Sequence, residues 1–170
     1  MAALIVVMAM LVLQNRNLKS RLAELESGTA TGAAPRLEVG DTVEGFTLAS
    51  LEGLDKSLKF SPGDPETLLF FFSPDCPACE TNFANWQTID RSVDEARRTV
   101  FVSTLAEDRT REYLAGKGLR GEVLLGNRDV LDRYKVSLIP TTVQVAAEGV
   151  VRGVWVGVLS DSVTEQLIQP

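Results

Sequence analysis

The sequence predicts an α/β domain in which helices cover both faces of a mixed sheet, preceded by an N-terminal anchor helix. Three observations predict this class. Short apolar runs alternate with segments of helical periodicity over residues 67–134, which favours parallel strands joined by helices. Two strand-like segments around a Gly turn follow at 141–156 and add antiparallel strands. An uncharged apolar run occupies residues 2–13.

The apolar run AALIVVMAMLVL is too short to span a membrane alone, since a helix of this length covers about 18 Å against about 30 Å of hydrocarbon. No Lys or Arg precedes it and no cleavage site follows, so it does not resemble a signal peptide. We expect the C-terminal part of a membrane anchor whose upstream half is missing from this chain. A buried or fraying helix is the alternative. By the positive-inside rule, the basic residues after the run would place the next segment in the cytoplasm. We therefore base the expected membrane topology on the function inferred below and not on charge.

The chain divides into three parts by composition. Residues 1–26 combine the anchor with a polar stalk helix, and residues 27–36, rich in Gly, Ala and Thr, form a flexible linker. Residues 37–170 are long enough for one domain with a core of its own.

The first half of the domain predicts two strands, a central strand and a long helix. Residues 46–49 alternate as a strand and reach a turn at Glu52-Gly53. Residues 67–72 (TLLFFF) lie between two prolines and suit a central strand buried on both faces. A helix begins near Cys76 or Pro77, because Pro is favourable in a first helical turn. Its apolar face carries Phe83, Trp86, Ile89 and Val93.

The second half repeats the alternation. Strands are predicted at 99–102 and 122–125, with a helix at 108–116 between them that glycines end. Asn127 caps a further helix carrying Val130, Leu131 and Tyr134. The remaining elements are hairpin strands at 141–147 and 150–156 around Glu148-Gly149, and a closing helix at 161–168. The two Trp and two Tyr residues are expected to pack in or near the core.

Composition excludes several function classes. The net charge is −6 without a basic stripe, which disfavours nucleic-acid binding. Histidine is absent, so the commonest general base and the commonest metal ligand are missing. We expect no cofactor and no bound metal.

The two cysteines, Cys76 and Cys79, are the main functional signal. Haem attachment fails because Glu80 stands where a His is required. A structural zinc site needs about four ligands, so two Cys leave it half-built unless two chains share it. Two inert core cysteines remain an alternative.

A redox pair fits the pattern better. A helix N-terminus stabilises the thiolate of Cys76, which we assign as the nucleophile. Cys79 lies one turn later on the same face and can resolve a mixed disulfide, while Pro77 and Ala78 form the turn between them.

Pro140 is a second feature. It can be a trans proline at the start of a strand, or it can follow a cis bond that packs Ile139-Pro140 against the cysteines and shapes a surface for a substrate chain. The residues alone do not decide between these.

Longer stretches resemble the redoxin branch of the thioredoxin family. They are VGDTVEGFTL at 39–48, LFFFSPDCPAC at 69–79 and VLDRYKV at 130–136, ahead of Ile139-Pro140-Thr141-Thr142. The branch includes membrane-anchored extracytoplasmic thiol–disulfide oxidoreductases of the TlpA and ResA kind. It also includes the MauD-like maturation protein of methylamine dehydrogenase, whose Phe-Ser-Pro-x-Cys-Pro-x-Cys pattern is the most similar.

The resemblance, over residues 38–168, implies a thioredoxin-like fold with a cis bond at Pro140. It implies that Cys76 and Cys79 are catalytic and that Ile139, Pro140 and Thr141 bind substrate. It also implies an N-terminal membrane anchor with the domain on the periplasmic side, a protein disulfide or dithiol as substrate, and a membrane protein as electron donor. The roles expected are reduction or isomerisation of protein disulfides, as in cytochrome c maturation, or maturation of a partner such as methylamine dehydrogenase.

Three positions depart from the family pattern. Asp75 replaces a Trp before the first Cys, Phe70 replaces a buried acid, and Asn82 replaces a Glu found in several relatives. The usual proton acceptor for Cys79 is therefore absent or replaced. Carboxylates at Asp75 and Glu80 are expected to oppose the helix dipole at Cys76, so the redox direction stays open.

Two other functions remain in competition. Ser73 and Cys76 match part of the peroxiredoxin motif, although Leu69 stands at the position of its Pro, so a peroxidase is one alternative. The other is a tethered binding module whose disulfide is only structural.

Overall fold

The computed structural model describes residue 14 and residues 35–169. The predicted anchor, stalk and linker therefore lie almost entirely outside the described residues, and their boundaries stay predictions. No helix in the described part of the chain is long and apolar enough to cross a bilayer. The compact unit considered below is Arg36–Pro170.

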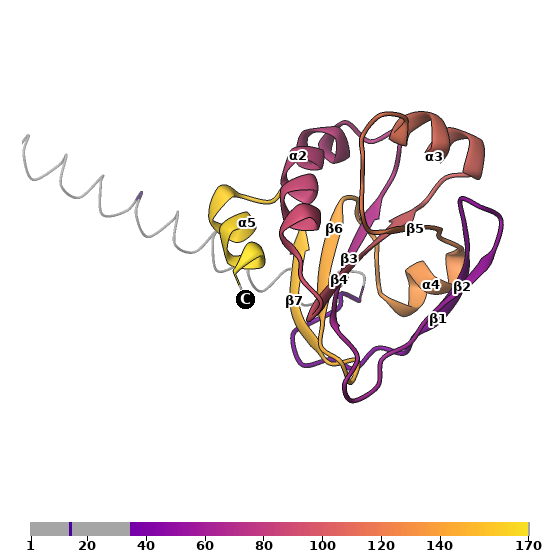
Figure 1. The fold of residues 1–170 in the computed structure, drawn as a ribbon. Helices are drawn as coiled ribbons and strands as arrows, with labels where there is room; N and C mark the ends of the chain where they lie inside the picture. The colour runs from indigo at the N-terminus through magenta and orange to yellow at the C-terminus, as the bar shows by residue number, and fades with distance from the viewer. Residues whose placement is uncertain (1–13, 15–34, 170) are drawn as a thin grey trace, which may run out of the picture. The chain divides into compact units, whose positions relative to one another are not determined.

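A seven-stranded mixed sheet in the order β2-β1-β5-β4-β3-β6-β7 forms the centre of this unit (Figure 1). The three central strands run parallel, and the strands on either side pair antiparallel. The strands are β1 (Phe46–Ser50), β2 (Asp55–Leu58), β3 (Glu66–Phe72), β4 (Arg97–Ser103), β5 (Glu122–Leu125), β6 (Thr141–Val145) and β7 (Val151–Val156).

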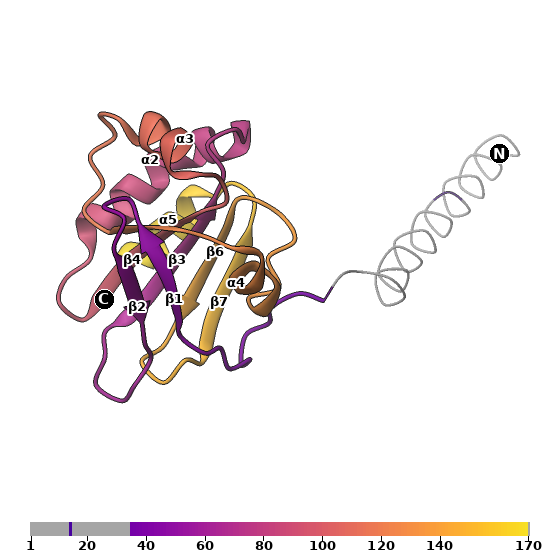
Figure 2. The ribbon, with the colours of Figure 1, turned by 90° about the vertical axis from the view of Figure 1, so that its right-hand side faces the viewer.

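Helices cover both faces of the sheet, which confirms the predicted fold class. Helix α4 packs on one face, and α2, α3 and α5 pack on the other (Figure 2). The helices are α2 (Pro77–Ser92), α3 (Glu107–Leu114), α4 (Arg128–Arg133) and α5 (Asp161–Ile168).

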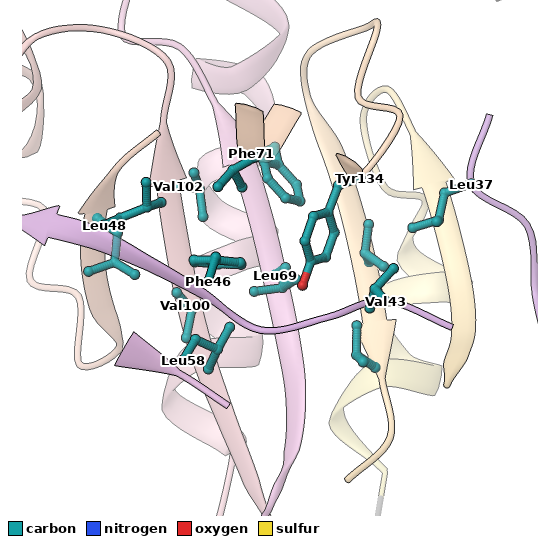
Figure 3. Close-up of a cluster of buried hydrophobic side chains, with 14 of the residues drawn as sticks. Leu37, Val43, Phe46, Leu48, Leu58, Leu69, Phe71, Val100, Val102 and Tyr134 are labelled. Carbon is teal, nitrogen blue, oxygen red and sulfur yellow. The ribbon is translucent and has the colours of Figure 1, made fainter. Parts of the chain in front are cut away.

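Strand β3 separates two hydrophobic cores because its side chains alternate between the faces. Leu69 and Phe71 enter the core under α4, which Figure 3 shows with Tyr134 at its centre. Phe70 and Phe72 enter the core under α2. Residues 68–72 are all fully buried, as the continuous apolar run predicts.

The second core is rich in aromatic side chains and holds α2 in place. Trp86 is fully buried, and its ring lies 5.6 Å from that of Phe70. Its indole Nε1 donates a hydrogen bond of 3.3 Å to Thr142 Oγ1 on β6. Because this polar tip is satisfied, burying the large ring adds apolar contact without leaving a donor unpaired.

The C-terminal end of α2 is fixed by a buried carboxylate. Asp90 is 1% exposed and accepts hydrogen bonds from the hydroxyl of Thr99 and from the backbone N–H groups of Arg120, at 2.6 Å, and Gly121, at 2.9 Å. A Cβ at Gly121 would lie 2.7 Å from the carbonyl oxygen of Thr99, so the close approach requires glycine. This network joins α2 to the starts of β4 and β5.

The hairpin strands are shorter than predicted. Strand β6 ends at Val145 and β7 begins at Val151, because the register shifts at Gln144/Val145 and a turn through Gly149, with φ of +84°, occupies the residues between. The predicted strand at 122–125 and helix at 161–168 match the structure.

Candidate active site

Cys76 lies between the end of β3 and the start of α2. Its carbonyl accepts hydrogen bonds from the N–H groups of Cys79, at 3.0 Å, and Glu80, at 3.2 Å, so it begins the helix as the N-cap. No side chain of residues 35–169 caps this terminus, and Pro77 stands in the first turn. The Cys76 thiol is partly exposed at a helix end whose dipole favours a thiolate.

Cys79 has a different environment. It is fully buried in the core under α2, where the alkyl and aromatic side chains exclude water. Burial raises the pKa of the Cys79 thiol to about 12, against a lowering by a backbone hydrogen bond at Ser73, while a hydrogen bond with Cys76 raises it further. Both cysteines are free thiols. The pair therefore presents one accessible sulfur and one protected sulfur.

The loop before β6 contacts the accessible sulfur. The Cys76 thiol donates a hydrogen bond to the carbonyl oxygen of Ile139 at an S···O distance of 3.6 Å. The Ile139–Pro140 peptide bond is cis, as the family resemblance implies. Pro140 is buried and its carbonyl accepts a hydrogen bond from Gly157 N at 2.8 Å. The fold thus brings together residues 63 positions apart.

Thr141 braces this loop from within. Its hydroxyl donates a hydrogen bond of 2.7 Å to the carbonyl of Leu138, and its side chain is 5% exposed. The structure therefore places Thr141 beside Pro140, with its hydroxyl used by the loop. Its role in substrate binding stays a prediction.

Exposed apolar side chains surround the same loop. Leu138 is 51% exposed, Val156, the partner of Thr141 in the sheet, is 49% exposed, and Val158 is 46% exposed. A cavity of about 190 Å³ opens beside them, between the loop, the end of α4 and the edge of the sheet. This part of the surface combines these apolar side chains with Lys135 and Ser137, which also line the cavity.

Neither position of the missing family acid carries a carboxylate. Phe70 is fully buried among aromatic rings. Asn82 is fully buried one turn after Cys79, and its Oδ1 accepts hydrogen bonds from Leu159 N at 2.9 Å and Asn85 Nδ2 at 3.2 Å. Asn82 thus joins α2 to the segment before α5.

The two acids beside the motif are both paired with cations, which sequence reasoning missed. Arg109 Nη2 lies 2.6 Å from Asp75 Oδ1, and Lys117 Nζ lies 2.9 and 2.8 Å from the two Glu80 carboxylate oxygens. The hydrogen bond from Lys117 is the main cause that lowers the pKa of Glu80. No local sequence pattern indicates these pairs, because each joins residues more than 30 positions apart.

The tyrosines and tryptophans pack as predicted. Tyr134 is buried and donates a hydrogen bond of 2.9 Å to the carbonyl of Glu44. Trp155 and Tyr113 are partly buried against the core under α2. Burial raises the pKa of both tyrosine hydroxyls, with a smaller contribution at Tyr113 from Glu80 and the cysteines.

Comparisons with known proteins agree with this geometry. The family model of the thioredoxin-like domain matches residues 59–169. The methylamine utilization protein MauD of Methylobacillus flagellatus is 26% identical over 117 residues, which cover 68% of this chain and 56% of that protein. The chain thus spans little more than half the length of this relative.

Solved structures show the same fold at low identity. A thiol:disulfide interchange protein of the thioredoxin family from Chlorobium tepidum superposes with a TM-score of 0.63 at 17% identity, covering 78% of this chain and 99% of that one. A peroxiredoxin-like protein from Aquifex aeolicus gives 0.65 at 17% identity, covering 78% and 87%. Because the family model covers well over half of the sequence, this chain belongs to the thioredoxin-like family.

Proposed function

We propose that this protein is a thiol–disulfide oxidoreductase that exchanges disulfides with protein substrates through Cys76 and Cys79. The observation that carries the proposal is the contrast between the two sulfurs beside the cis-proline loop. Cys76 is accessible and contacts Ile139, whereas Cys79 is buried directly behind it. Such an arrangement allows one sulfur to meet a substrate and the other to complete the reaction.

In the reducing direction, the Cys76 thiolate attacks one sulfur of a substrate disulfide. The Cys76–substrate disulfide forms, the substrate disulfide breaks, and the second substrate sulfur leaves as a thiolate that takes a proton. Cys79 then loses its proton and attacks the Cys76 sulfur. The Cys76–Cys79 disulfide forms, the substrate leaves as a dithiol, and two electrons have passed to it. The reverse sequence oxidises a dithiol.

The raised pKa of Cys79 affects the second step. With a pKa of about 12 this thiol is protonated at neutral pH, so its proton has to leave as the attack proceeds. In return, the protected sulfur does not react with small oxidants or with a second substrate. The mixed disulfide on Cys76 therefore has one internal sulfur positioned to resolve it.

The surface around the loop supports a polypeptide as the substrate. Leu138, Val156 and Val158 are exposed on the segments that hold Pro140 in place. Exposed apolar patches of this kind are typical of protein-binding surfaces. We propose that a segment of the substrate chain lies over Ile139 and Pro140, with its sulfur at Cys76.

We further propose that the domain acts outside the cytoplasm, tethered by residues 1–26 and supplied with electrons by a membrane protein. The similarity to MauD, a methylamine utilization protein, supports a role in the maturation of a partner protein. A reductase role of the kind used in cytochrome c maturation is the other form of the same activity.

The test uses the full chain and its two serine variants. We expect Cys76→Ser to abolish reduction of a disulfide-bonded protein such as insulin, and Cys79→Ser to accumulate a mixed disulfide on Cys76, detected by mass spectrometry. Equilibration of the unmodified protein with glutathione buffers gives its direction. A potential near about −270 mV indicates a reductase, and one near about −120 mV indicates an oxidant.

Two results would contradict this function. Reduction that persists in Cys76→Ser would remove Cys76 from the reaction. Rapid peroxide consumption with a sulfenic acid on Cys76, and no exchange with protein disulfides, would instead favour the peroxidase, which Ser73 and the likeness to the Aquifex protein keep as the second candidate.

A further inference from the structure

The residues immediately before and after the Cys76–Cys79 motif are both acids, and cations from a single segment neutralise both. Asp75 pairs with Arg109 of α3, and Glu80 pairs with Lys117, three residues after that helix ends. Helix α3 packs beside the start of α2 (Figure 1). One segment therefore supplies the compensating charge on both sides of the reactive cysteine.

Lys117 is held firmly in place. Its ammonium bonds both carboxylate oxygens of Glu80, at 2.9 and 2.8 Å, and lies 4.5 Å from the ring centre of Phe83 and 4.4 Å from that of Tyr113. Its backbone carbonyl also accepts a hydrogen bond from the side chain of Gln87 on α2. The Lys117 side chain is 21% exposed, so solvent screens its charge only in part.

Arg109 is the weaker of the two partners. Its guanidinium reaches Asp75 at 2.6 Å, but the side chains are 59% and 58% exposed. Glu112, 3.7 Å away on the same helix, competes for the same guanidinium. Exposed pairs of this kind are screened by water and salt, so we expect a smaller effect from Arg109 than from Lys117.

The pairs lie within electrostatic reach of the sulfurs. The hydroxyl oxygen of Tyr113 is buried and makes no hydrogen bond within the described residues. After burial, the causes that raise the pKa of Tyr113 are Glu80, then Cys79 and Cys76. Cys76, Cys79 and Tyr113 belong to the same hydrophobic cluster, and Lys117 Nζ lies over the Tyr113 ring while it pairs with Glu80. The Lys117–Glu80 pair therefore lies at the edge of the cluster that holds both sulfurs.

The sign of the effect follows from charge. A carboxylate near a thiol disfavours the thiolate, and a cation that neutralises the carboxylate removes this penalty. Within the described part of the chain, the charged side chains paired beside the motif are Asp75 with Arg109 of α3, and Glu80 of α2 with Lys117, while the cis-proline loop contributes the neutral carbonyl of Ile139.

We propose that Lys117, and more weakly Arg109, are positioning residues that set the reactivity of Cys76 by neutralising Glu80 and Asp75. The proposal rests on the thiol–disulfide function given above. It assigns a redox role to two side chains that touch neither sulfur nor substrate.

The test compares Lys117→Gln with the double variant Glu80→Gln/Lys117→Gln in the full-length protein. Two quantities are measured at pH 7 and low salt: the rate at which iodoacetamide alkylates Cys76 in the reduced protein, and the ratio of reduced to oxidised protein in a fixed glutathione buffer. We expect Lys117→Gln to lower the alkylation rate by about three- to tenfold, because an uncompensated Glu80 carboxylate opposes negative charge on the attacking sulfur. The ratio of reduced to oxidised protein falls only to the extent that Cys76 is a thiolate at this pH. The double variant returns to within about twofold of the unmodified protein, since cation and anion leave together.

Three further variants test whether the effect depends on the charge of Lys117 and on its place beside the motif. Lys117→Arg keeps the charge and should retain the original rate. Arg109→Gln should lower it by about twofold or less, and added salt should remove that difference. Arg128→Gln is the control: it removes an exposed ion pair with Asp132 on α4, on the opposite face of the sheet, and should change neither quantity.

The outcomes distinguish a failure of this proposal from a failure of the proposed thiol–disulfide function. If Lys117→Gln reacts at the original rate, the proposal is wrong and Lys117 does not influence Cys76. If the double variant stays as slow as Lys117→Gln, the charge role is wrong and Lys117 acts through packing alone. If the unmodified protein forms no reversible Cys76–Cys79 disulfide, the proposed function itself is wrong.

Discussion

The two ends of helix α2 use carboxylates in opposite ways. At the N-terminal end, Asp75 and Glu80 are largely exposed and paired with side-chain cations, beside a helix terminus that no side chain caps. At the C-terminal end, Asp90 is 1% exposed, and its three hydrogen-bond donors among the described residues are all neutral. The first end therefore places an ion pair on each side of the Cys76–Cys79 motif. The second end is held to the starts of β4 and β5 by these hydrogen bonds.

The largest expected effect is a loss of stability at the C-terminal end of α2 with no change in the redox equilibrium of the cysteines. Asp90→Ala should lower the free energy of unfolding by about 3–5 kcal/mol, because three donors around a buried carboxylate, one buried and two part-buried, lose their acceptor. Urea denaturation of the reduced protein, followed by circular dichroism, measures this loss. The glutathione equilibrium should stay unchanged, since Asp90 lies at the far end of α2.

Glu95→Ala, an exposed position near the same end, is the matched control and should leave the urea midpoint in place. A shifted glutathione equilibrium in Asp90→Ala would show that the two ends are coupled and that the comparison is too simple.

Alkaline pH should lower the free energy of unfolding through the buried thiol of Cys79. Burial raises the pKa of Cys79 from 9.0 to about 12, so above about pH 9 the unfolded chain releases this proton while the folded chain retains it. The reduced protein should therefore be fully stable on this account below pH 9 and lose stability as the pH rises toward 12. Urea midpoints at about pH 7.5 and about pH 9.5 measure the loss, before the tyrosines contribute strongly.

Cys79→Ala should show a smaller loss between these two pH values, whereas Asp90→Ala should keep the full loss. An equal loss in Cys79→Ala would mean that another group, such as Tyr113 or Tyr134, dominates the alkaline behaviour.

The smallest expected effect concerns the uncapped start of α2. Ser is a favourable N-cap and Ala is not, so Cys76→Ser should be more stable than Cys76→Ala by about 1 kcal/mol. Asn127→Ala gives the reference value, because the Asn127 side chain already caps α4 through Val130 N at 2.9 Å. Equal stability of the two Cys76 variants would show that the turn around Pro77 leaves no room for a cap.

The local features of the site could be predicted from the sequence. The continuous apolar run predicts β3, and Pro77 in a first turn places Cys76 at the start of a helix. Asn127 likewise caps α4 as predicted, because capping depends on residues three positions apart.

The long-range features could not be predicted. Nothing near Asp90 indicates that Arg120 and Gly121 will direct their N–H groups at it, because these donors lie about 30 positions away and meet it only in the folded sheet. For the same reason, the sequence alone leaves the acids beside the cysteines uncompensated, since their cationic partners come from a distant segment. Residue patterns describe neighbours along the chain, whereas charge compensation depends on neighbours in space.

The pairing of both flanking acids with the α3 segment has a consequence for engineering and for comparison among relatives. The compensating cations stand 34 and 37 positions after the acids they serve. Grafting the CPAC motif into another scaffold would transfer the sulfurs and the acids without their cations. Conversely, exchanging the α3 segment would replace the cations beside Cys76 and leave the cis-proline loop at Ile139-Pro140 intact. Under the proposals above, the reactivity of Cys76 and the choice of substrate are therefore set by different segments of this domain.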